Sequence, residues 1–335
     1  MRAVHIDRFH DLDGLVLRDD GEPPQPGPNE VLVRVRSVSL NYRDLMVLDG
    51  TYPFPGHPGV IPVSDGAGEV VAVGPRADRF RVGERIANTY FQGYIDGPLT
   101  MATASSQPGA TQDGMLAEFR LLHEDWLVRI PESISFAEAA TLPCAGLTAW
   151  SALHGPRPVL AGESVLVIGS GGVGLLAIQL AQALGAQVLA TASGGRKAEV
   201  LKDLGVAQVL DHRTDWVDDL TAHLGGGADH VVDTIGTVTL ERSIRSAAPG
   251  GQISVIGTIA EGAAPIDPAV FGPGKPFSLR RIAVGSRTQL EALVAFVAEH
   301  DLHPVIDRTY RFEEALDAYR YVAGRRHLGK VVISV

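Results

Sequence analysis

The 335-residue sequence has little cysteine and no long apolar run. Its single cysteine, Cys144, excludes an intramolecular disulfide and is typical of a reducing compartment. No apolar segment reaches the length of a membrane span, and no secretory segment follows the N-terminus. Lysine and arginine form no cluster and the net charge is −10, which argues against nucleic acid or an anionic membrane as a partner. We therefore expect a globular, cytoplasmic protein whose length allows two domains.

One stretch in the middle of the chain has the order strand, glycine turn, helix. Val165–Ile168 is a short apolar run that is typical of a buried parallel strand, and apolar residues recur at helical spacing after the turn until Gly185. The glycines between them have G-x-G-x-x-G spacing, which in this context predicts dinucleotide binding, with the pyrophosphate at the helix N-terminus. The residues that we expect to bind the cofactor here are Gly169, Gly171, Gly172, Val173 and Gly174.

The rest of the chain shows two different patterns. Short predicted strands with glycine turns, such as Val31–Val38 and Asp65–Gly74, precede the fingerprint and predict a compact β-barrel-like domain. Strands and helices alternate after Gly185, and together with Val165–Ile168 they predict a doubly wound parallel sheet. From Pro304 onward a strand, a helix and a strand follow, which we interpret as a return to the first domain.

Four further segments carry a family resemblance. They are Asn41–Asp44, Asp65–Val70, Val82–Arg85 and Leu142–Ala149. With the glycine spacing, and in this order, they resemble the medium-chain dehydrogenase/reductase superfamily, especially its zinc-independent quinone oxidoreductases and NAD(P)-dependent alcohol dehydrogenases. The resemblance implies an α/β fold in which a Rossmann domain (148–287) is inserted into a GroES-like β-barrel domain (1–147 and 288–335). It also implies an active site in the cleft between the domains and a homodimer joined through the last Rossmann strand.

Zinc-dependent members of this superfamily hold their catalytic metal with a Cys, a His-Glu pair and a second Cys. The sequence has Asn41, Ser64–Asp65 and Cys144 at these positions, so only the last thiol is retained. A catalytic zinc needs about three protein ligands, and one thiolate with one carboxylate falls short of that number. We therefore expect no metal, and we interpret Cys144 as a small buried hydrophobic residue.

The residues after the second predicted Rossmann strand indicate which nicotinamide cofactor is used. An NAD site ends this strand with an acidic residue that binds the ribose 2′-hydroxyl, whereas here Ser193, Arg196 and Lys197 follow. These side chains suit a 2′-phosphate and favour NADP(H); the alternative is that Arg196 and Lys197 only solvate the first turn of a helix. The other residues expected at the cofactor, from the resemblance or from their places after later strands, are Thr148, His212, Thr234, Gly257, Val284 and Ser286.

Without zinc, the negative charge that hydride transfer builds on a carbonyl oxygen needs another partner. Quinones and α,β-unsaturated carbonyls delocalise this charge, and Asn41 has an amide that can donate to the oxygen. Tyr42 and Tyr52 are the nearest phenols by sequence for a proton relay; the alternative is that both only pack against the cleft wall. We therefore expect a zinc-independent, NADPH-dependent reductase of quinones or α,β-unsaturated carbonyls. The alternatives are an alcohol dehydrogenase or aldehyde reductase acting without zinc, and a nicotinamide-binding protein with little turnover.

Overall fold

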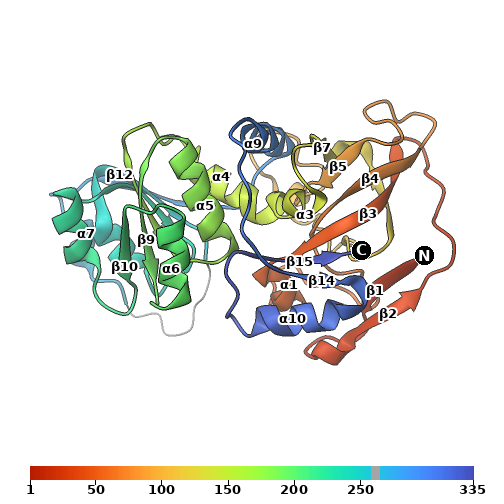
Figure 1. Cartoon of the computed structure of the whole chain (residues 1–335), viewed down its shortest axis with the longest axis horizontal. Helices are drawn as coiled ribbons and strands as arrows, with labels where there is room; N and C mark the ends of the chain where they lie inside the picture. Colours follow the sequence, from red (N-terminus) through yellow and green to blue (C-terminus); the bar gives the residue numbers. More distant parts are fainter. Residues whose placement is uncertain (258–264) are drawn as a thin grey trace. The chain divides into compact units, whose positions relative to one another are not determined.

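The computed structural model describes residues 1–257 and 265–335, and these form two compact units (Figure 1). The first unit comprises Met1–Leu147 and Gly285–Val335, and the second comprises Thr148–Val284. The second unit ends at Val284, whereas the sequence analysis places the end of the Rossmann domain at residue 287. The difference has a physical reason, because the Arg287 guanidinium donates to the carboxylate of Asp125 in the first unit at 2.7 Å.

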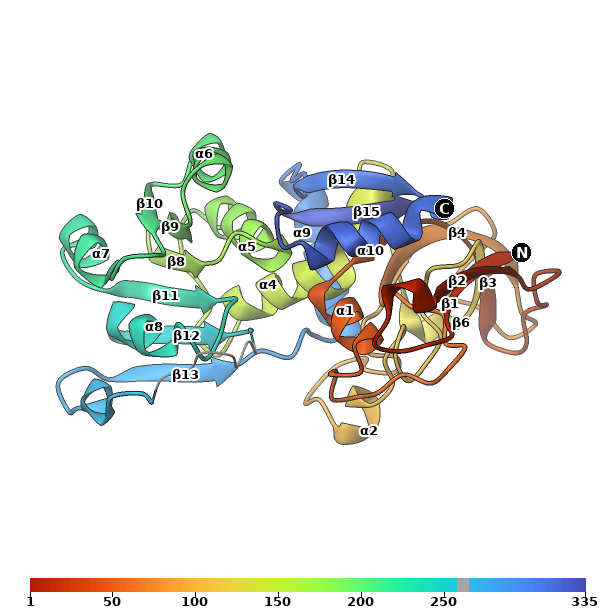
Figure 2. The same cartoon turned by 90° about the horizontal axis from the view of Figure 1, so that it is seen from below.

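The second unit is built on a six-stranded sheet in which every pair of neighbouring strands is parallel. Its spatial order is β10-β9-β8-β11-β12-β13, which Figure 2 shows nearly edge-on. This order confirms the predicted doubly wound sheet, in which the first two crossovers run one way and the later ones the other. The strands are β8 (Ser164–Ile168), β9 (Gln187–Ala192), β10 (Gln208–Asp211), β11 (Ala228–Asp233), β12 (Ala247–Val255) and β13 (Phe277–Arg281).

Helices connect the parallel strands, because a parallel pair needs a crossover. Figure 1 shows α5 and α6 together in front of the sheet, where α5 packs on β8 and β9, and α6 packs on β9 and β10. Trp216, which is fully buried, anchors the part of the core beneath α7 and α8. The helices are α4 (Leu147–Leu153), α5 (Gly172–Ala183), α6 (Arg196–Asp203), α7 (Val217–Leu224), α8 (Leu240–Ser246) and the 3-10 turn η4 (Pro268–Phe271).

The first unit contains a seven-stranded sheet and a separate two-stranded one, β1 (Arg2–Ile6) with β2 (Leu15–Asp19). The larger sheet has the order β14-β15-β3-β4-β5-β7, and β6 also pairs with β3. It is antiparallel except for the pair β14–β15. Its strands are β3 (Glu30–Leu40), β4 (Asp65–Val73), β5 (Arg85–Asn88), β6 (Phe119–His123), β7 (Leu127–Arg129), β14 (Ile306–Arg311) and β15 (Lys330–Ser334).

The helices of the first unit are mostly short. The longest are α9 (Arg287–Glu299) and α10 (Ala315–Ala323), and α10 packs on β14, β15 and β3. Pro143 lies in a π-helical turn rather than in regular α-helix, as expected for a residue without an N–H group. The remaining elements are α1 (Tyr42–Leu48), α2 (Met101–Ala104), α3 (Phe136–Ala139), the π-helical turn η3 (Leu142–Gly146), and the 3-10 turns η1 (Leu12–Gly14), η2 (Glu124–Trp126) and η5 (Phe312–Glu314).

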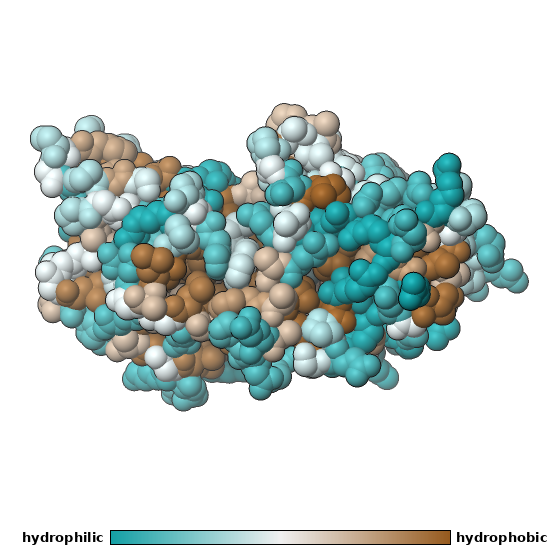
Figure 3. Space-filling model, turned by 90° about the horizontal axis from the view of Figure 1, so that it is seen from above, coloured by the Kyte–Doolittle hydropathy of each residue, from teal (hydrophilic) through white to brown (hydrophobic). Residues whose placement is uncertain are grey.

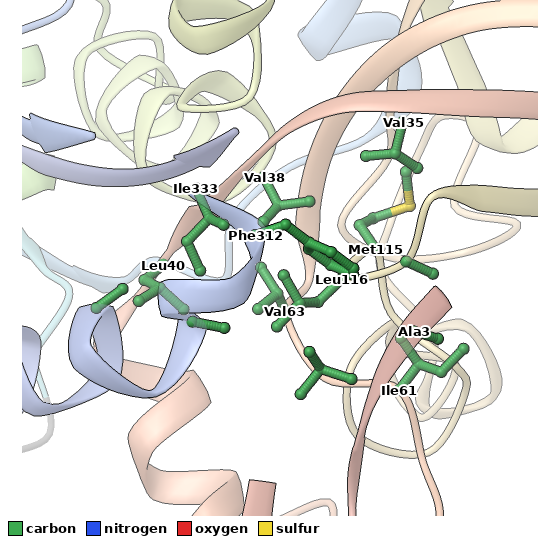
Figure 4. Close-up of a cluster of buried hydrophobic side chains, with 14 of the residues drawn as sticks. Ala3, Val35, Val38, Leu40, Ile61, Val63, Met115, Leu116, Phe312 and Ile333 are labelled. Atoms are coloured by element: carbon green, nitrogen blue, oxygen red, sulfur yellow. The ribbon is translucent and has the colours of Figure 1, made fainter. Parts of the chain in front are cut away.

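The core of the first unit fixes the ends of its central strands. Figure 4 shows Leu40 of β3, Ile333 of β15, Val63 and Phe312 among the side chains of this buried cluster. Leu40 and Val63 directly precede Asn41 and Ser64 in the chain. Burial of these two apolar side chains therefore holds the backbone from which the next, polar, side chains project.

The surface is mixed in character. On the face seen in Figure 3, hydrophilic residues are interspersed with smaller groups of hydrophobic ones. Within the described residues, no helix has both the length and the apolar character needed to cross a membrane.

Candidate active site and nucleotide-binding turn

The ends of three strands of the first unit meet at Asn41. The register pairs Val331 of β15 with Leu40 of β3, so Lys330 comes next to Asn41. On the other side, Ser39 of β3 pairs with Asp65 of β4. The antiparallel pairing thus brings residues from near the beginning and the end of the chain to one place.

Lys330 lies against the end of β3. Its ammonium donates to the carbonyl oxygen of Leu40 at 2.7 Å and makes a short hydrogen bond to Oδ1 of Asn41. Only 3% of Lys330 is exposed, which is rare for a lysine and requires partners of this kind.

The amide of Asn41 continues this contact toward a carboxylate. Its Nδ2 donates to Oγ of Ser64 at 3.3 Å, and the Ser64 hydroxyl donates to Oδ1 of Asp65 at 2.7 Å. The backbone N–H of Cys144 donates to Oδ2 of the same carboxylate at 3.0 Å. We call Asn41, Ser64, Asp65, Cys144 and Lys330 the Asn41 cluster.

Burial dominates the electrostatics of this cluster. It lowers the pKa of Lys330, while the charge of Asp65 opposes this shift. It raises the pKa of Asp65, which Lys330 opposes in turn. Burial also raises the pKa of the Cys144 thiol, so this thiol is protonated at neutral pH. Burial raises the pKa of the neighbouring Asp44 to about 6, against the charge of Arg43.

These residues do not fit a catalytic zinc ion. Both oxygens of Asp65 already accept hydrogen bonds, Asn41 and Ser64 offer an amide and a hydroxyl instead of further ligands, and Lys330 occupies the amide oxygen of Asn41 as a donor. A zinc site needs several deprotonated ligands from Cys, His or carboxylates. No three His, Cys, Asp or Glu residues lie close enough to share a metal ion within residues 1–257 and 265–335.

The backbone before Ser64 is strained. Val63 has φ +71°, a conformation that is an outlier for a β-branched residue. Gly109 and Gly114 pack directly on it: an added Cβ would lie 2.7 Å from the nitrogen of Val63 and 2.3 Å from its carbonyl oxygen, respectively. Strain of this kind is concentrated at functional sites, where the surrounding structure enforces it.

The two tyrosines proposed from the sequence have different surroundings. Tyr42 is 43% exposed, and its hydroxyl accepts a hydrogen bond from Arg325. Tyr52 is partly buried, and its hydroxyl lies 2.8 Å from that of Tyr90 and 2.5 Å from Oε1 of Gln107.

Arg43 links Tyr52 to the Asn41 cluster. Its guanidinium lies 4.7 Å from the ring centroid of Tyr52 and 3.5 Å from a carboxylate oxygen of Asp44. The other oxygen of Asp44 accepts the backbone N–H of Asn41 at 2.8 Å. Of the two phenols, Tyr52 is therefore the one that shares a network of contacts with Asn41.

The glycine turn of the second unit has the geometry of a dinucleotide site. Gly169 has φ +105°, which favours glycine, and its N–H is 3.3 Å from Oγ1 of Thr191. A Cβ at Gly174 would lie 2.0 Å from the carbonyl oxygen of Gly169, so helix and turn approach closely, whereas a Cβ at Gly171 would meet open space. Gly172 begins α5 and Val173 follows it, so their N–H groups belong to the unbonded first turn of the helix. These features fit a bound pyrophosphate.

The ends of β9 and β10 enclose a hollow of about 160 Å³, lined by residues that include Gly194, Lys202 and Asp211. Ser193 is exposed, and Arg196 and Lys197 begin α6 beside it. The guanidinium of Arg213 forms an ion pair with Asp211 at 2.6 Å, and one of its nitrogens would lie 3.6 Å from a Cβ on Gly194.

The other residues predicted at the cofactor are distributed as follows. Thr148 is buried in α4, and His212 follows β10. The hydroxyl of Thr234 donates to the carbonyl oxygen of Ile168 at 2.7 Å. A Cβ at Gly257 would lie 2.1 Å from the carbonyl oxygen of Ile235, so only glycine fits there.

The last two predicted cofactor residues lie at the boundary between the units. Val284 has φ +45°, another strained conformation for a β-branched residue. Ser286 is the N-cap of α9, and its hydroxyl accepts the N–H of Gln289 at 3.3 Å.

Lys330 is a site residue that reasoning from the sequence missed. A lysine at the start of an apolar segment is ordinarily the exposed end of a strand. The signal that identifies it is the register between β15 and β3, which joins residues about 290 positions apart and cannot be read locally.

Comparisons with known proteins identify the family. Residues 27–132 match the alcohol dehydrogenase GroES-like domain, and residues 172–299 match the zinc-binding dehydrogenase family. The chain is 37% identical to a zinc-type alcohol dehydrogenase-like protein of Schizosaccharomyces pombe, over 100% of this chain and 99% of that one. It is 31% identical to a quinone oxidoreductase of Pseudomonas aeruginosa, over 94% of each chain.

The solved structures agree. A putative alcohol dehydrogenase from Sinorhizobium meliloti 1021 superposes with a TM-score of 0.92 at 37% identity, covering 100% of this chain and 98% of that one. These matches confirm the predicted family and fold class. The chain belongs to the medium-chain dehydrogenase/reductase superfamily and is a nicotinamide-dependent oxidoreductase.

Proposed function

We propose that the protein is a zinc-independent, NADPH-dependent oxidoreductase that transfers hydride to quinones or α,β-unsaturated carbonyls. The observation that carries this proposal is the Asn41 cluster, where Asn41 and Ser64 stand at positions that the family resemblance assigns to zinc ligands and the ammonium of Lys330 bonds to the amide of Asn41. Bound NADPH supplies the hydride. The chain must then bind the acceptor, orient its oxygen and stabilise the charge that develops there.

The choice of acceptor follows from how little localised charge this cluster can stabilise. A zinc ion acts as a strong Lewis acid on an isolated carbonyl, whereas an amide N–H offers only a hydrogen bond. Reduction of an enone or a quinone spreads the new charge over a conjugated system. These acceptors therefore need less stabilisation at one oxygen than a simple aldehyde or ketone does.

The proposal for NADPH depends on the loop after β9. Ser193, Arg196 and Lys197 lie there, and Arg213 approaches the same loop while it neutralises Asp211. Cationic and hydroxyl groups suit a 2′-phosphate, to which an arginine can donate two parallel hydrogen bonds.

Two finer points remain predictions of this proposal. Tyr52 is our candidate for the proton relay, because Arg43 and Asp44 connect it to Asn41. The expected homodimer would use β13, the outer strand of its sheet, on which Leu279 is 46% exposed.

The first prediction concerns metal content. Protein expressed in zinc-supplemented medium and then dialysed should contain far less than one zinc per chain, because Asn41, Ser64 and Lys330 do not form a metal site. Elemental analysis measures the content, and NADPH oxidation with a quinone should be unchanged by a chelator. One zinc per chain, together with loss of activity in the chelator, would contradict the proposal.

The second prediction concerns cofactor preference. NADPH should be favoured over NADH by roughly tenfold or more, since a hydrogen bond to a charged group contributes about 1.5–3 kcal/mol. Arg196→Ala should raise the Kd for NADPH and leave that for NADH nearly unchanged, so NADH serves as the internal control. Titration of cofactor fluorescence measures both constants. Equal weakening of both cofactors would show that Arg196 has only a structural role.

The third prediction concerns Asn41. Asn41→Ala should lower kcat with a smaller effect on NADPH binding, because loss of one oxyanion donor typically costs about 10²–10³-fold when the charge is localised. The loss should be smaller for quinones, which spread the charge themselves. Asn41→Asp should be worse than Asn41→Ala, since a carboxylate repels the developing negative charge. Wild-type kcat for Asn41→Ala on every acceptor would remove Asn41 from the active site.

A further inference from the structure

The amide of Asn41 has two ends with opposite hydrogen-bonding character, and the contacts on both sides determine which end faces which neighbour. A lysine ammonium has three donors and no acceptor, so the group that faces Lys330 must be the oxygen Oδ1. Burial disfavours the charged form of Lys330 and lowers its pKa, and the carboxylates of Asp65 and Asp44 oppose this effect.

The other side of the amide is determined independently. The hydroxyl hydrogen of Ser64 is used in the bond to Asp65 at 2.7 Å, so Oγ of Ser64 is left to accept. It accepts from Nδ2 of Asn41 at 3.3 Å. An amide rotated by half a turn would place N–H groups against the ammonium and an oxygen against the Ser64 oxygen, leaving buried polar groups unpaired on both sides.

We propose that Lys330 is a positioning residue that locks the Asn41 amide with Nδ2 as its donor end, so that an N–H of Nδ2 and not the oxygen Oδ1 is presented to the oxygen of the acceptor. This inference depends on the proposed function and specifies how its site is built. The backbone carbonyl of Leu40 holds the ammonium of Lys330 from a second direction, so the lysine itself is fixed by β3.

Because Lys330 would act through Asn41, the effects of substituting Lys330 and of substituting Asn41 should depend on each other. Lys330→Gln replaces a group that only donates with one that also accepts, so the Asn41 amide is free to rotate. With cyclohex-2-enone as the acceptor, we expect Lys330→Gln to lower kcat by about tenfold or more, up to the loss in Asn41→Ala, with the KM for NADPH unchanged. Lys330→Arg, which retains donors only, should keep more of the activity than Lys330→Gln does.

The double variant Asn41→Ala/Lys330→Gln separates positioning from a general structural role. If Lys330 acts through Asn41, adding Lys330→Gln to Asn41→Ala should change kcat little. The inference would be overturned if the two losses in kcat multiplied in the double variant, or if Lys330→Gln alone left kcat unchanged. Lys275 gives a matched control, because its ammonium also donates to a backbone carbonyl, that of Arg245, at 2.7 Å. Lys275→Gln should leave kcat unchanged.

A spectroscopic readout keeps the inference testable without turnover. The chain has three asparagines, Asn29, Asn41 and Asn88, so protein labelled with ¹⁵N-asparagine gives a simple side-chain amide spectrum. The Asn41 pair, identified by its loss in Asn41→Ala, should shift in Lys330→Arg, while the Asn29 pair stays in place. An Asn41 pair that does not respond would overturn the inference. If the Asn41 signals respond but the protein reduces no acceptor, the contact between Lys330 and Asn41 is supported and only the proposed function is overturned.

Discussion

The site of the first unit depends on one contact, the hydrogen bonding of the buried Lys330 ammonium to the end of β3. Burying a lysine is costly unless its charge is paired and its donors are used. Here Leu40 and Asn41 supply acceptors, and Asp65 supplies the opposite charge. Loss of any one of these partners would leave the buried ammonium less well compensated. The strand ends, the amide orientation and the charge balance of the cluster are therefore mutually dependent.

The two units contribute different kinds of chemistry. The second unit offers mainly backbone N–H groups at a glycine turn, a feature that suits any dinucleotide. The first unit offers side chains, and in the proposed function these determine which acceptor can react. Val63, with its positive φ, lies directly beside the polar residues, which indicates that the fold tolerates strain to place them. Substrate preference within this superfamily should accordingly vary with the first unit more than with the glycine turn.

Local patterns in the sequence were sufficient for much of the fold. The apolar run before Gly169 and the spacing of the glycines predicted β8, the turn and α5, because each depends on neighbouring residues. The position of Asn41 at the end of a strand followed from the alternation in 31–38. Lys330 could not be found in this way, since its contacts depend on a pairing between distant strands. The difference between Tyr42 and Tyr52 likewise depends on Arg325, Gln107 and Tyr90, which approach only in the folded chain.

The central claim is that hydride passes from NADPH to a conjugated acceptor without a metal. The most direct measurement uses chelator-treated protein, cyclohex-2-enone, and NADPH carrying deuterium at one or the other C4 position, with the product analysed by mass spectrometry and NMR. We expect deuterium from one of the two labelled cofactors at the β-carbon of the cyclohexanone, and none from the other. Deuterium in neither product, or transfer only after zinc is added back, would contradict the account.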